Sequence, residues 1–339
     1  MNLPSTFKNI LIVRTDRIGD VVLTTPAVKA LRQAYPGSRI SILATPVTYD
    51  LVFGNPYVDE VLVDDRQGVH RGLGGFLRMV RELRSQRFDL AIIFHTKRRY
   101  NLACYAAGIP CRLGYKNNKF GSLLSLPLKD ARHLGEKHEA EYCLDVLKAI
   151  GIEHNDLDLF VPTQKAAEAW VIEWMGGQGL SPNGYIVVHP GASDPAKCWP
   201  IADFILLIDR LIERYSLKVV LVGSAQTVPM AAEVLQRARQ SPEILDLTGK
   251  TSLAQMVSLL RRARLLISND SGPVHVAAGV GISVISLFLR DQPGINAGRW
   301  KPLGPKSFIL SNTPAPFSVE DVMELADRIF QANSQYEIF

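Results

Sequence analysis

Cysteine and long apolar runs are scarce in this 339-residue chain, and each shortage excludes a class of protein. The four cysteines include no C-x-x-C pair and no compact set with histidine, so we expect reduced thiols and no metal site. The longest uncharged apolar stretch, residues 282–289, is far shorter than the ~20 residues of a membrane-spanning helix. The apolar run at residues 10–13 is too short for a signal-peptide core. The sequence therefore predicts a cytoplasmic protein that meets a membrane only from its surface.

Several catalytic fingerprints are missing as well. No G-x-G-x-x-G follows the first predicted strand and no G-x-x-x-x-G-K-[ST] occurs, which argues against a dinucleotide oxidoreductase and a P-loop hydrolase. H-E-x-x-H and G-x-S-x-G are absent too. The formal charge of +5 favours anionic partners, but no basic motif interleaved with aromatic residues accompanies it. Nucleic acid is therefore not an expected partner.

Short apolar runs alternate with amphipathic stretches, which is the pattern of parallel sheets covered by helices. In the first half, we predict strands at residues 9–14, 39–44, 58–63, 89–94 and 112–114, with helices at 21–34, 75–86 and 138–150. In the second half, we predict strands at 185–189, 218–222, 244–247, 264–268 and 283–288, with helices at 200–215, 228–240, 253–263, from 273, and 319–332. The predicted fold class is α/β with two Rossmann-like domains.

The domain boundary is expected where the composition changes. Residues 153–162 are acidic and bounded by proline, and residues 176–184 are rich in glycine, serine and proline. We predict an N-terminal domain over residues 1–170 and a C-terminal domain over 171–339. The last predicted helix either completes the second domain or packs back on the first.

Polar residues follow five of the predicted strands, at 15–20, 95–99, 189–197, 223–226 and 269–272. The carboxyl ends of parallel strands meet at one edge of a sheet, and ligands bind there. The pattern therefore predicts an active site between the two domains.

Asp20 lies where a helix is predicted to begin, within R-T-D-R-I-G-D-V-V-L-T-T-P at residues 14–26. Two interpretations are open. A carboxylate in a first helical turn complements the positive end of the helix dipole. Beside a cleft, the same carboxylate can take the proton of an acceptor hydroxyl as its oxygen attacks an anomeric carbon.

The motif H-P-G-A-S-D-P-A-K-C-W-P, residues 189–200, follows the first strand of the second half. Its small residues and Ser193 allow backbone amides to approach an anion, and Lys197 adds a full charge. The alternative is a surface loop with an ordinary lysine.

The motif N-D-S-G-P-V-H-V-A-A-G, residues 269–279, places Ser271 and Gly272 ahead of a proline suited to a first helical turn. Such a helix N-terminus can hold a phosphate. Asp270 would repel a phosphate, so we expect it to orient the loop or to accept a hydrogen bond from a sugar hydroxyl.

Basic residues also gather in the first half, where Lys97, Arg98 and Arg99 directly follow a predicted strand and Arg112 lies near the next one. They are candidates to bind phosphates and carboxylates of an acceptor, or to hold the protein on an anionic membrane. The alternative is a solvated basic face.

Together these motifs resemble glycosyltransferase family 9, the ADP-heptose:lipopolysaccharide heptosyltransferases. The resemblance rests on I-L-I-V-R-T-D-R-I-G-D-V-V-L-T-T-P-A, H-P-G-A-S-x-x-x-K-x-W-P, D-L-T-G-K-T-S-L and S-N-D-S-G-P-V-H-V-A-A, which occur in this order over nearly the whole chain. It implies a GT-B fold, in which two Rossmann-like domains turn their parallel sheets toward an interdomain cleft. It also implies an acceptor on the first domain, a nucleotide sugar on the second, and no metal or other cofactor.

The resemblance assigns roles to particular residues. It makes Asp20 the general base of an inverting transfer. It implies that Lys197 and Ser193 bind the donor diphosphate, and that Asp270, Ser271 and Gly272 hold donor phosphate and sugar. The basic residues of the first half would then bind a Kdo-lipid A core at the inner face of the inner membrane.

One position departs from the family pattern. Members commonly carry an acidic residue just after the strand equivalent to residues 218–222, where it holds the donor ribose. This chain has G-S-A-Q-T at residues 223–227, so Gln226 supplies a neutral hydrogen bond there, or the donor differs from ADP-heptose. A different acceptor, a nucleotide-sugar epimerase or hydrolase on the same fold, and a non-catalytic sugar-nucleotide binding protein also fit the motifs.

Overall fold

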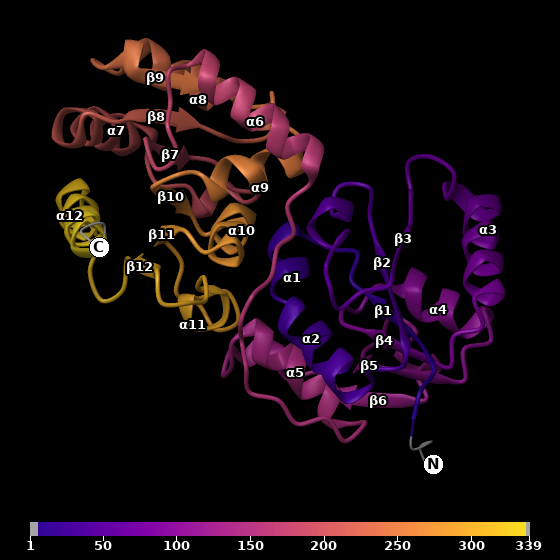
Figure 1. Cartoon of the computed structure of the whole chain (residues 1–339). Coiled ribbons are helices and arrows are strands. Elements are labelled where there is room, and N and C mark those ends of the chain that lie inside the picture. The colour runs from indigo at the N-terminus through magenta and orange to yellow at the C-terminus, as the bar shows by residue number, and fades with distance from the viewer. Residues whose placement is uncertain (1–5, 337–339) are drawn as a thin grey trace. The chain divides into compact units, whose positions relative to one another are not determined.

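The computed structural model describes residues 6–336 and divides the chain into two compact units, Met1–Pro162 and Thr163–Phe339 (Figure 1). Each unit contains a six-stranded sheet in which every neighbouring pair of strands is parallel. The predicted α/β class with two Rossmann-like units is confirmed.

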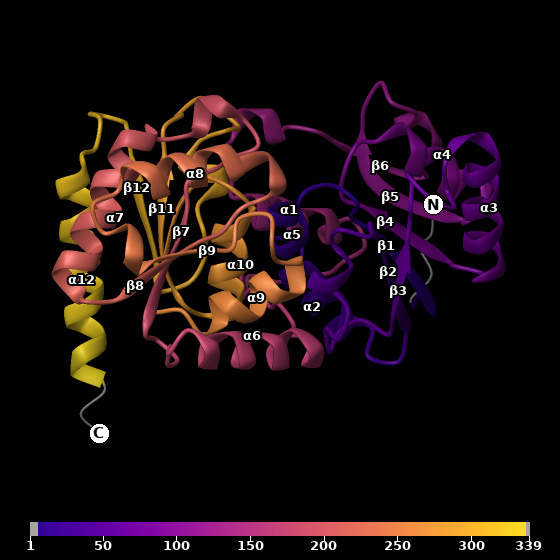
Figure 2. The ribbon, with the colours of Figure 1, turned by 90° about the horizontal axis from the view of Figure 1, so that it is seen from above.

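The first unit has the strand order β3-β2-β1-β4-β5-β6. Its strands are β1 (Asn9–Val13), β2 (Arg39–Ala44), β3 (Glu60–Val63), β4 (Leu90–Ile93), β5 (Cys111–Lys116) and β6 (Leu126–Lys129). Its helices are α1 (Ile18–Val22), α2 (Thr25–Ala34), α3 (Gly72–Ser85), α4 (Arg98–Ala106) and α5 (Glu139–Lys148), with 3₁₀ turns η1 (Tyr49–Leu51), η2 (Gly121–Leu123) and η3 (Arg132–Leu134). Helices α2 and α5 pack together on one side of the sheet, and α3 and α4 on the other (Figure 2). The central strands are buried on both faces, which explains their nearly continuous apolar sequence.

The second unit repeats this plan with the order β12-β11-β10-β7-β8-β9. Its strands are β7 (Tyr185–His189), β8 (Lys218–Leu221), β9 (Ile244–Asp246), β10 (Leu265–Asn269), β11 (Ser283–Phe288) and β12 (Ser307–Ser311). Its helices are α6 (Lys165–Gly177), α7 (Ile201–Tyr215), α8 (Val228–Arg237), α9 (Leu253–Arg261), α10 (Gly272–Val280), α11 (Ala297–Trp300) and α12 (Val319–Tyr336), with 3₁₀ turns η4 (Pro195–Lys197), η5 (Ala225–Thr227) and η6 (Ser241–Glu243). Helix α12 packs on α7, because Val322, Ala326 and Ile329 join the core of this unit.

One predicted helix is wrong in an informative way. The stretch at residues 21–34 forms two helices, α1 and α2, and the first begins earlier, at Ile18. Pro26 has no N–H to donate to the carbonyl of Val22, and the side chain of Thr25 donates to that carbonyl instead, at 2.7 Å. The break leaves α1 as a short, separate helix that carries Asp20.

Five helices and strands lie outside the predicted set: β6, β12, α4, α6 and α11. Helix α4 begins inside the basic run, at Arg98, and its charged first residues interrupt the apolar pattern by which a helix is predicted. Strand β6 is an edge strand with a half-buried sequence, L-P-L-K, so it has no continuous apolar run. Short edge strands of this kind give a weak sequence signal.

In both sheets the strand order reverses beside the first strand, between β1 and β4 in the first unit and between β7 and β10 in the second. Ligands bind outside such switch points, because the loops that leave the two strands run in opposite directions and open a crevice. Val13 lies opposite Ile93, and His189 lies opposite Ser268. The predicted site segments therefore start at the same level on neighbouring strands.

Candidate active site

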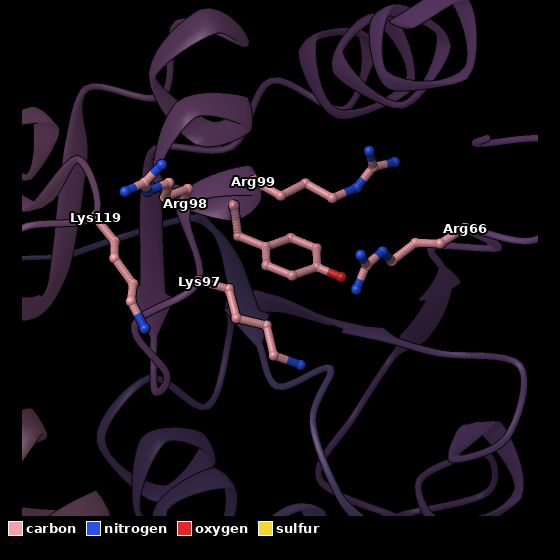
Figure 3. A pocket seen from close by; sticks show the side chains of 6 residues that line it. Arg66, Lys97, Arg98, Arg99 and Lys119 are labelled. Atoms are coloured by element: carbon pink, nitrogen blue, oxygen red, sulfur yellow. The ribbon is translucent and has the colours of Figure 1, made fainter. Parts of the chain in front are cut away.

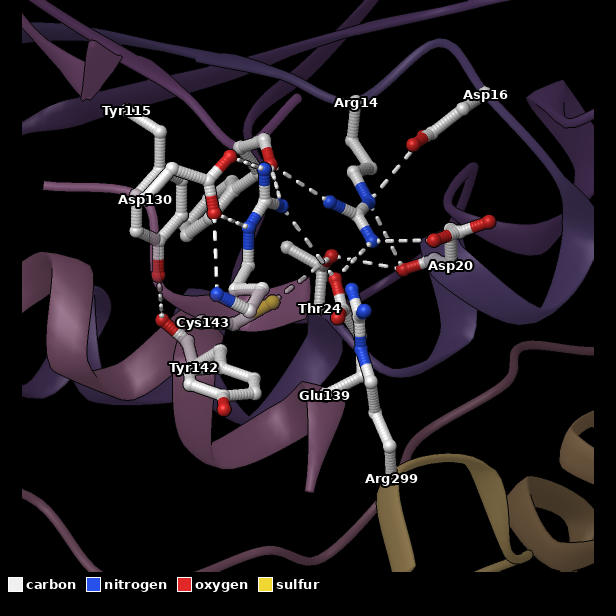
Figure 4. Close-up of polar contacts among 12 residues, drawn as sticks. Arg14, Asp16, Asp20, Thr24, Tyr115, Asp130, Glu139, Tyr142, Cys143 and Arg299 are labelled. Atoms are coloured by element: carbon white, nitrogen blue, oxygen red, sulfur yellow. Dashed lines mark hydrogen bonds and ion pairs between the residues drawn. The ribbon is translucent and has the colours of Figure 1, made fainter. Parts of the chain in front are cut away.

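Asp20 is the third residue of α1, and its carboxylate is held by Arg14 (Figure 4). Arg14 Nη2 donates to Asp20 Oδ1 at 2.8 Å. No side chain caps the N-terminus of α1. Asp20 thus lies in the first turn of α1, as the helix-dipole interpretation expects, and its carboxylate also pairs with Arg14.

Arg14 is a buried charge at the centre of a cluster of acidic groups, with 1% of its side chain exposed. Its Nε donates to the backbone oxygen of Asp20 at 3.1 Å and also lies 3.2 Å from a carboxylate oxygen of Asp16. Nη1 donates to the carbonyl of Phe94 at 3.0 Å, and Nη2 also donates to Glu139 Oε1 at 3.1 Å. The guanidinium thereby connects the ends of β1 and β4 with α1 and α5, and its burial is compensated by these partners.

The surroundings of Asp20 make it more basic than an ordinary carboxylate. Burial raises the pKa of Asp20 from 3.8 to about 6. The positive charge of Arg14 opposes this shift, and the negative charges of Asp16 and Glu139 add to it. A carboxylate with a pKa near neutrality is ionised at physiological pH and still binds a proton, which suits a general base.

The loops after β1 and β4 are held together by two hydrogen bonds. Lys97 Nζ donates to the carbonyl of Thr15 at 2.9 Å, and the Thr15 hydroxyl is hydrogen-bonded to His95 Nε2 at 2.8 Å. Burial lowers the pKa of His95 to about 4, so this imidazole is neutral. Burial also lowers the pKa of Lys97. The predicted residue Lys97 thus lies beside the loop that carries Asp20.

A basic pocket of about 490 Å³ opens next to this loop (Figure 3). It is lined by Arg66, Lys97, Arg98, Arg99, Tyr100 and Lys119. Its volume is in the range of small-ligand sites. The structure therefore places Lys97, Arg98 and Arg99 in one pocket with two more basic residues of the first half, Arg66 and Lys119.

Arg99 is fixed at the wall of this pocket by a buried carboxylate. Its Nε and Nη2 donate to the two oxygens of Asp64 at 2.8 and 2.9 Å, and the Tyr100 hydroxyl donates to Asp64 at 2.8 Å. Asp64 is fully buried, and its carboxylate orients the side chains of Arg99 and Tyr100 in the first turn of α4. Arg98 is exposed at the start of that helix.

Arg112 does not join the pocket. It is the second residue of β5, at the amino-terminal end of the strand, where it pairs in register with Ala91. Its guanidinium donates to the carbonyl of Leu123 at 2.7 Å and to that of Ile109, and lies over the ring of Tyr105. Arg112 thus lies at the end of the strand opposite to that of the ligand-binding edge.

In the second unit, Lys197 forms an ion pair with Asp270. Lys197 belongs to η4 after β7, and Asp270 follows β10, so the pair joins the two loops at the switch point. We expected the Asp270 carboxylate to repel a phosphate. In the structure it instead positions Lys197, whose positive charge would attract a phosphate.

Ser271 is the N-cap of α10, and a buried histidine contacts its hydroxyl. His189 Nδ1 lies 3.2 Å from Ser271 Oγ and 3.0 Å from Ser268 Oγ. Burial lowers the pKa of His189 to about 4, so the ring is neutral. Ser271 Oγ also lies 3.0 Å from Ser268 Oγ, so His189, Ser268 and Ser271 form one hydrogen-bonded group at the N-terminus of α10.

The remaining predicted donor residues lie on the same loops. Ser193 is exposed in the loop after β7, and Gln226 is exposed in η5 after β8. Gly272 is the first residue of α10. A Cβ at Gly191 would come within 2.4 Å of Thr227 Cγ2, so the loops after β7 and β8 pack too closely for any other residue there.

Glu139 and Asp64 are residues of this site that sequence reasoning missed, whereas His189 lies in the motif singled out at residues 189–200. Asp64 directly follows a strand, a signal that was available. Glu139 gives no such signal, because a glutamate in a first helical turn is commonplace. Within residues 6–336, no group of three or more His, Cys, Asp or Glu side chains could hold a metal ion, and no described helix is long and apolar enough to cross a membrane.

Two parallel α/β units, with a carboxylate at one switch point and a lysine beside a helix N-terminus at the other, define a GT-B glycosyltransferase. The sequence profile of glycosyltransferase family 9 (heptosyltransferase) matches residues 76–324. The chain belongs to this family and is a glycosyltransferase.

Known relatives agree in sequence and fold. The chain is 27% identical to lipopolysaccharide heptosyltransferase 3 of Escherichia coli K12, over 80% of this chain and 79% of the relative. A crystal structure of a family 9 glycosyl transferase from Veillonella parvula superposes with a TM-score of 0.87 at 24% identity, covering 98% of this chain and 99% of that one. The structure of E. coli ADP-heptose lps heptosyltransferase II superposes with a TM-score of 0.80 at 22% identity, over 96% and 99% of the two chains.

Proposed function

We propose that this enzyme transfers a heptose with inversion from ADP-heptose to a lipopolysaccharide inner-core acceptor, and that Asp20 is the general base. The observation that carries the proposal is the state of the Asp20 carboxylate. One oxygen, Oδ1, accepts a hydrogen bond from Arg14, and burial raises the pKa of the Asp20 carboxyl to about 6. The other oxygen is then the one that takes the acceptor proton.

The proposed reaction is a single displacement. Asp20 removes the proton of the acceptor hydroxyl, and that oxygen attacks the anomeric carbon of the donor sugar through an oxocarbenium-like transition state. The bond from the anomeric carbon to the phosphate oxygen breaks, and ADP leaves. In this reaction no covalent sugar-enzyme intermediate is formed.

On the donor side, we assign Lys197, Ser193 and the Ser271–Gly272 end of α10 to the leaving diphosphate. This assignment is supported by the Lys197–Asp270 pair, which fixes the cation, and by the contact of Ser271 with His189. A full charge and free helix amides stabilise the negative charge that develops on the leaving group.

On the acceptor side, we assign the basic pocket to phosphates or carboxylates of a Kdo-lipid A core. Arg98 and Lys97 line it, and Arg112 is left out of the assignment because it lies at the other end of its strand. An acceptor of this kind is anchored in lipid, so the reaction would take place at the cytoplasmic face of the inner membrane.

The choice of donor and acceptor is supported by the relatives. The E. coli relative is named a lipopolysaccharide heptosyltransferase, and the E. coli structure of the same fold is an ADP-heptose enzyme. Gln226 favours a second candidate, transfer from another nucleotide sugar, because a neutral amide replaces the acid that the family pattern has for the ribose.

The experiment is to incubate the enzyme with ADP-heptose and a truncated Kdo-lipid A and to weigh the product by mass spectrometry. A mass gain of one heptose, lost in Asp20→Asn although ADP still binds, is the expected result. A gain only with a different nucleotide sugar would replace the donor assignment. Release of free sugar without acceptor would indicate a hydrolase, and transfer at the normal rate by folded Asp20→Asn would refute the base.

The acceptor assignment has a matched pair of variants. Arg98→Gln removes a cation from the pocket and is expected to raise the acceptor KM by about ten-fold, because a charge-assisted hydrogen bond contributes roughly 1.5 kcal/mol. Arg112→Gln removes the same charge from the other end of the sheet and should leave the acceptor KM unchanged. Equal effects of the two substitutions would indicate that the pocket does not bind the acceptor.

A further inference from the structure

Helix α3 carries an exposed apolar stripe that the packing of the fold does not use. Its buried face consists of Met79, Val80 and Leu83. Beside this face, Leu73 is 75% exposed and Leu77 is 44% exposed, one turn apart. Val69, in the loop before the helix, is 55% exposed. An isolated exposed leucine needs no explanation, but three large apolar side chains within nine residues form a patch.

Three arginines lie close to this patch along the chain. Arg71, Arg78 and Arg81 are exposed, and Arg81 continues the Leu73–Leu77 stripe by one more turn. Among the described residues, neither Arg71 nor Arg81 has an ion-pair partner, while Arg78 lies 3.2 Å from Glu82. We call Val69, Leu73, Leu77 and these three arginines the α3 face.

The positive charge of the chain is concentrated here. Residues 65–87 contain six arginines, one aspartate and one glutamate, so this segment has a formal charge of +4 in a chain whose total is +5. Exposed leucines with exposed arginines close by on the same helix are typical of helices that lie in the plane of a membrane surface.

The α3 face also adjoins the basic pocket. Phe76 of α3 lies under the guanidinium of Arg99, which lines the pocket, at 5.3 Å from ring centroid to Cζ. Arg99 further donates to the carbonyl of His70, at 3.0 Å, in the loop that leads into the helix. Helix α3 and the loop before it are therefore held against the wall of the pocket.

We propose that the α3 face docks the enzyme on an anionic lipid bilayer, with Leu73 and Leu77 at the boundary between headgroups and acyl chains and the arginines on lipid phosphates. Charge complementarity selects this occupant. A second copy would bring two segments of charge +4 face to face, and this repulsion opposes a symmetric dimer. The proposal goes beyond the proposed function, and it draws on it only for the presence of an acceptor in the same lipid surface.

The test measures the binding of the full chain to vesicles by co-sedimentation, without any catalytic step. We expect binding to vesicles of phosphatidylglycerol and phosphatidylcholine in equal amounts, weaker binding to phosphatidylcholine alone, and weakening by salt. Arg71→Gln with Arg81→Gln should weaken binding by about thirty-fold, at about a five-fold loss per arginine. Leu73→Ser with Leu77→Ser should weaken it by about ten-fold or more.

A matched control uses Ile172→Ser with Arg237→Gln, an exposed apolar residue and an exposed arginine on α6 and α8. It should bind vesicles like the parent protein. Transfer to a delipidated, soluble acceptor should be unchanged in all three double variants, which separates lipid binding from catalysis. Absence of vesicle binding, or equal binding by the leucine, arginine and control variants, would overturn the proposal. A dimer that dissociates in the leucine variant would instead assign the face to a second copy.

Discussion

Replacing Glu139 by glutamine should shift the pH dependence of transfer to lower pH. Glu139 and Asp20 share the same nitrogen of Arg14, at 3.1 and 2.8 Å, and the negative charge of Glu139 raises the pKa of Asp20. Glutamine keeps the shape of the side chain and removes that charge. The pKa of Asp20 should therefore fall, and its ionised form should persist at lower pH.

The size of the shift follows from the geometry. Because both carboxylate oxygens lie within 3.1 Å of Arg14 Nη2, they are at most about 6 Å apart. Two unit charges at this distance repel by about 3 kcal/mol at an effective dielectric constant of about 20, which corresponds to about two pH units. Screening by solvent at the partly open edge of the cluster reduces this to about one pH unit.

The assay is the pH dependence of kcat/KM for the acceptor, which reports the pKa of the base before the acceptor binds. In the parent enzyme the acidic limb should fall near the pKa of about 6, since protonated Asp20 cannot accept the acceptor proton. In Glu139→Gln the limb should move to lower pH. Glu141→Gln is the matched control, because Glu141 lies in the same first turn of α5 and accepts from the backbone of His138 at 2.7 Å.

Two results would refute this reasoning. An acidic limb that stays at the same pH while kcat/KM falls at every pH would mean that Glu139 has only a structural role. An equal shift in Glu141→Gln would mean that the effect comes from the helix end and not from the charge next to Arg14.

Three further predictions concern the donor site and stability. Lys197→Gln should raise the Kd of ADP, measured by calorimetry, by roughly ten- to a hundred-fold, because a charged hydrogen bond to the diphosphate is lost; an unchanged Kd would exclude Lys197 from the site. Asp64→Asn should lower the free energy of unfolding, measured in urea, by about 3–5 kcal/mol, because it leaves the Arg99 guanidinium without its buried partner. The control Asp65→Asn should lower it by less than about 1 kcal/mol, and similar losses in the two variants would contradict this reasoning. The pKa of Asp20 in the folded protein lies above its unfolded value of 3.8, so the folded state binds the proton more tightly and loses stability as the pH rises through about 6. The free energy of unfolding of Asp20→Asn, relative to that of the parent, should therefore increase between pH 3.8 and 6. A difference that does not change with pH would argue against the raised pKa.

The sequence by itself determined the class of fold and the position of the candidate site segments. Alternating apolar and amphipathic stretches require parallel sheets, and the polar residues after each strand then fall at one edge of the sheet whatever the order of the strands. This is why Asp20, Lys197 and Ser271 could be singled out, and why three strands were predicted to the residue, at 39–44, 185–189 and 283–288.

Only the tertiary structure decided which of these residues meet. Arg14 contacts Glu139 across 125 residues of sequence, because α5 packs beside α2 on one side of the sheet. Lys197 contacts Asp270 across 73 residues, because β7 and β10 are neighbouring strands and their loops lie side by side. Strand order depends on the packing of the whole sheet, and no local pattern encodes it. The same holds for Arg112. It carries the same charge as Arg98, but it lies at the amino-terminal end of β5, away from the ligand-binding edge of the sheet. The basicity of Asp20 likewise depends on burial and on a glutamate from a distant helix, so it is a property of the folded protein alone.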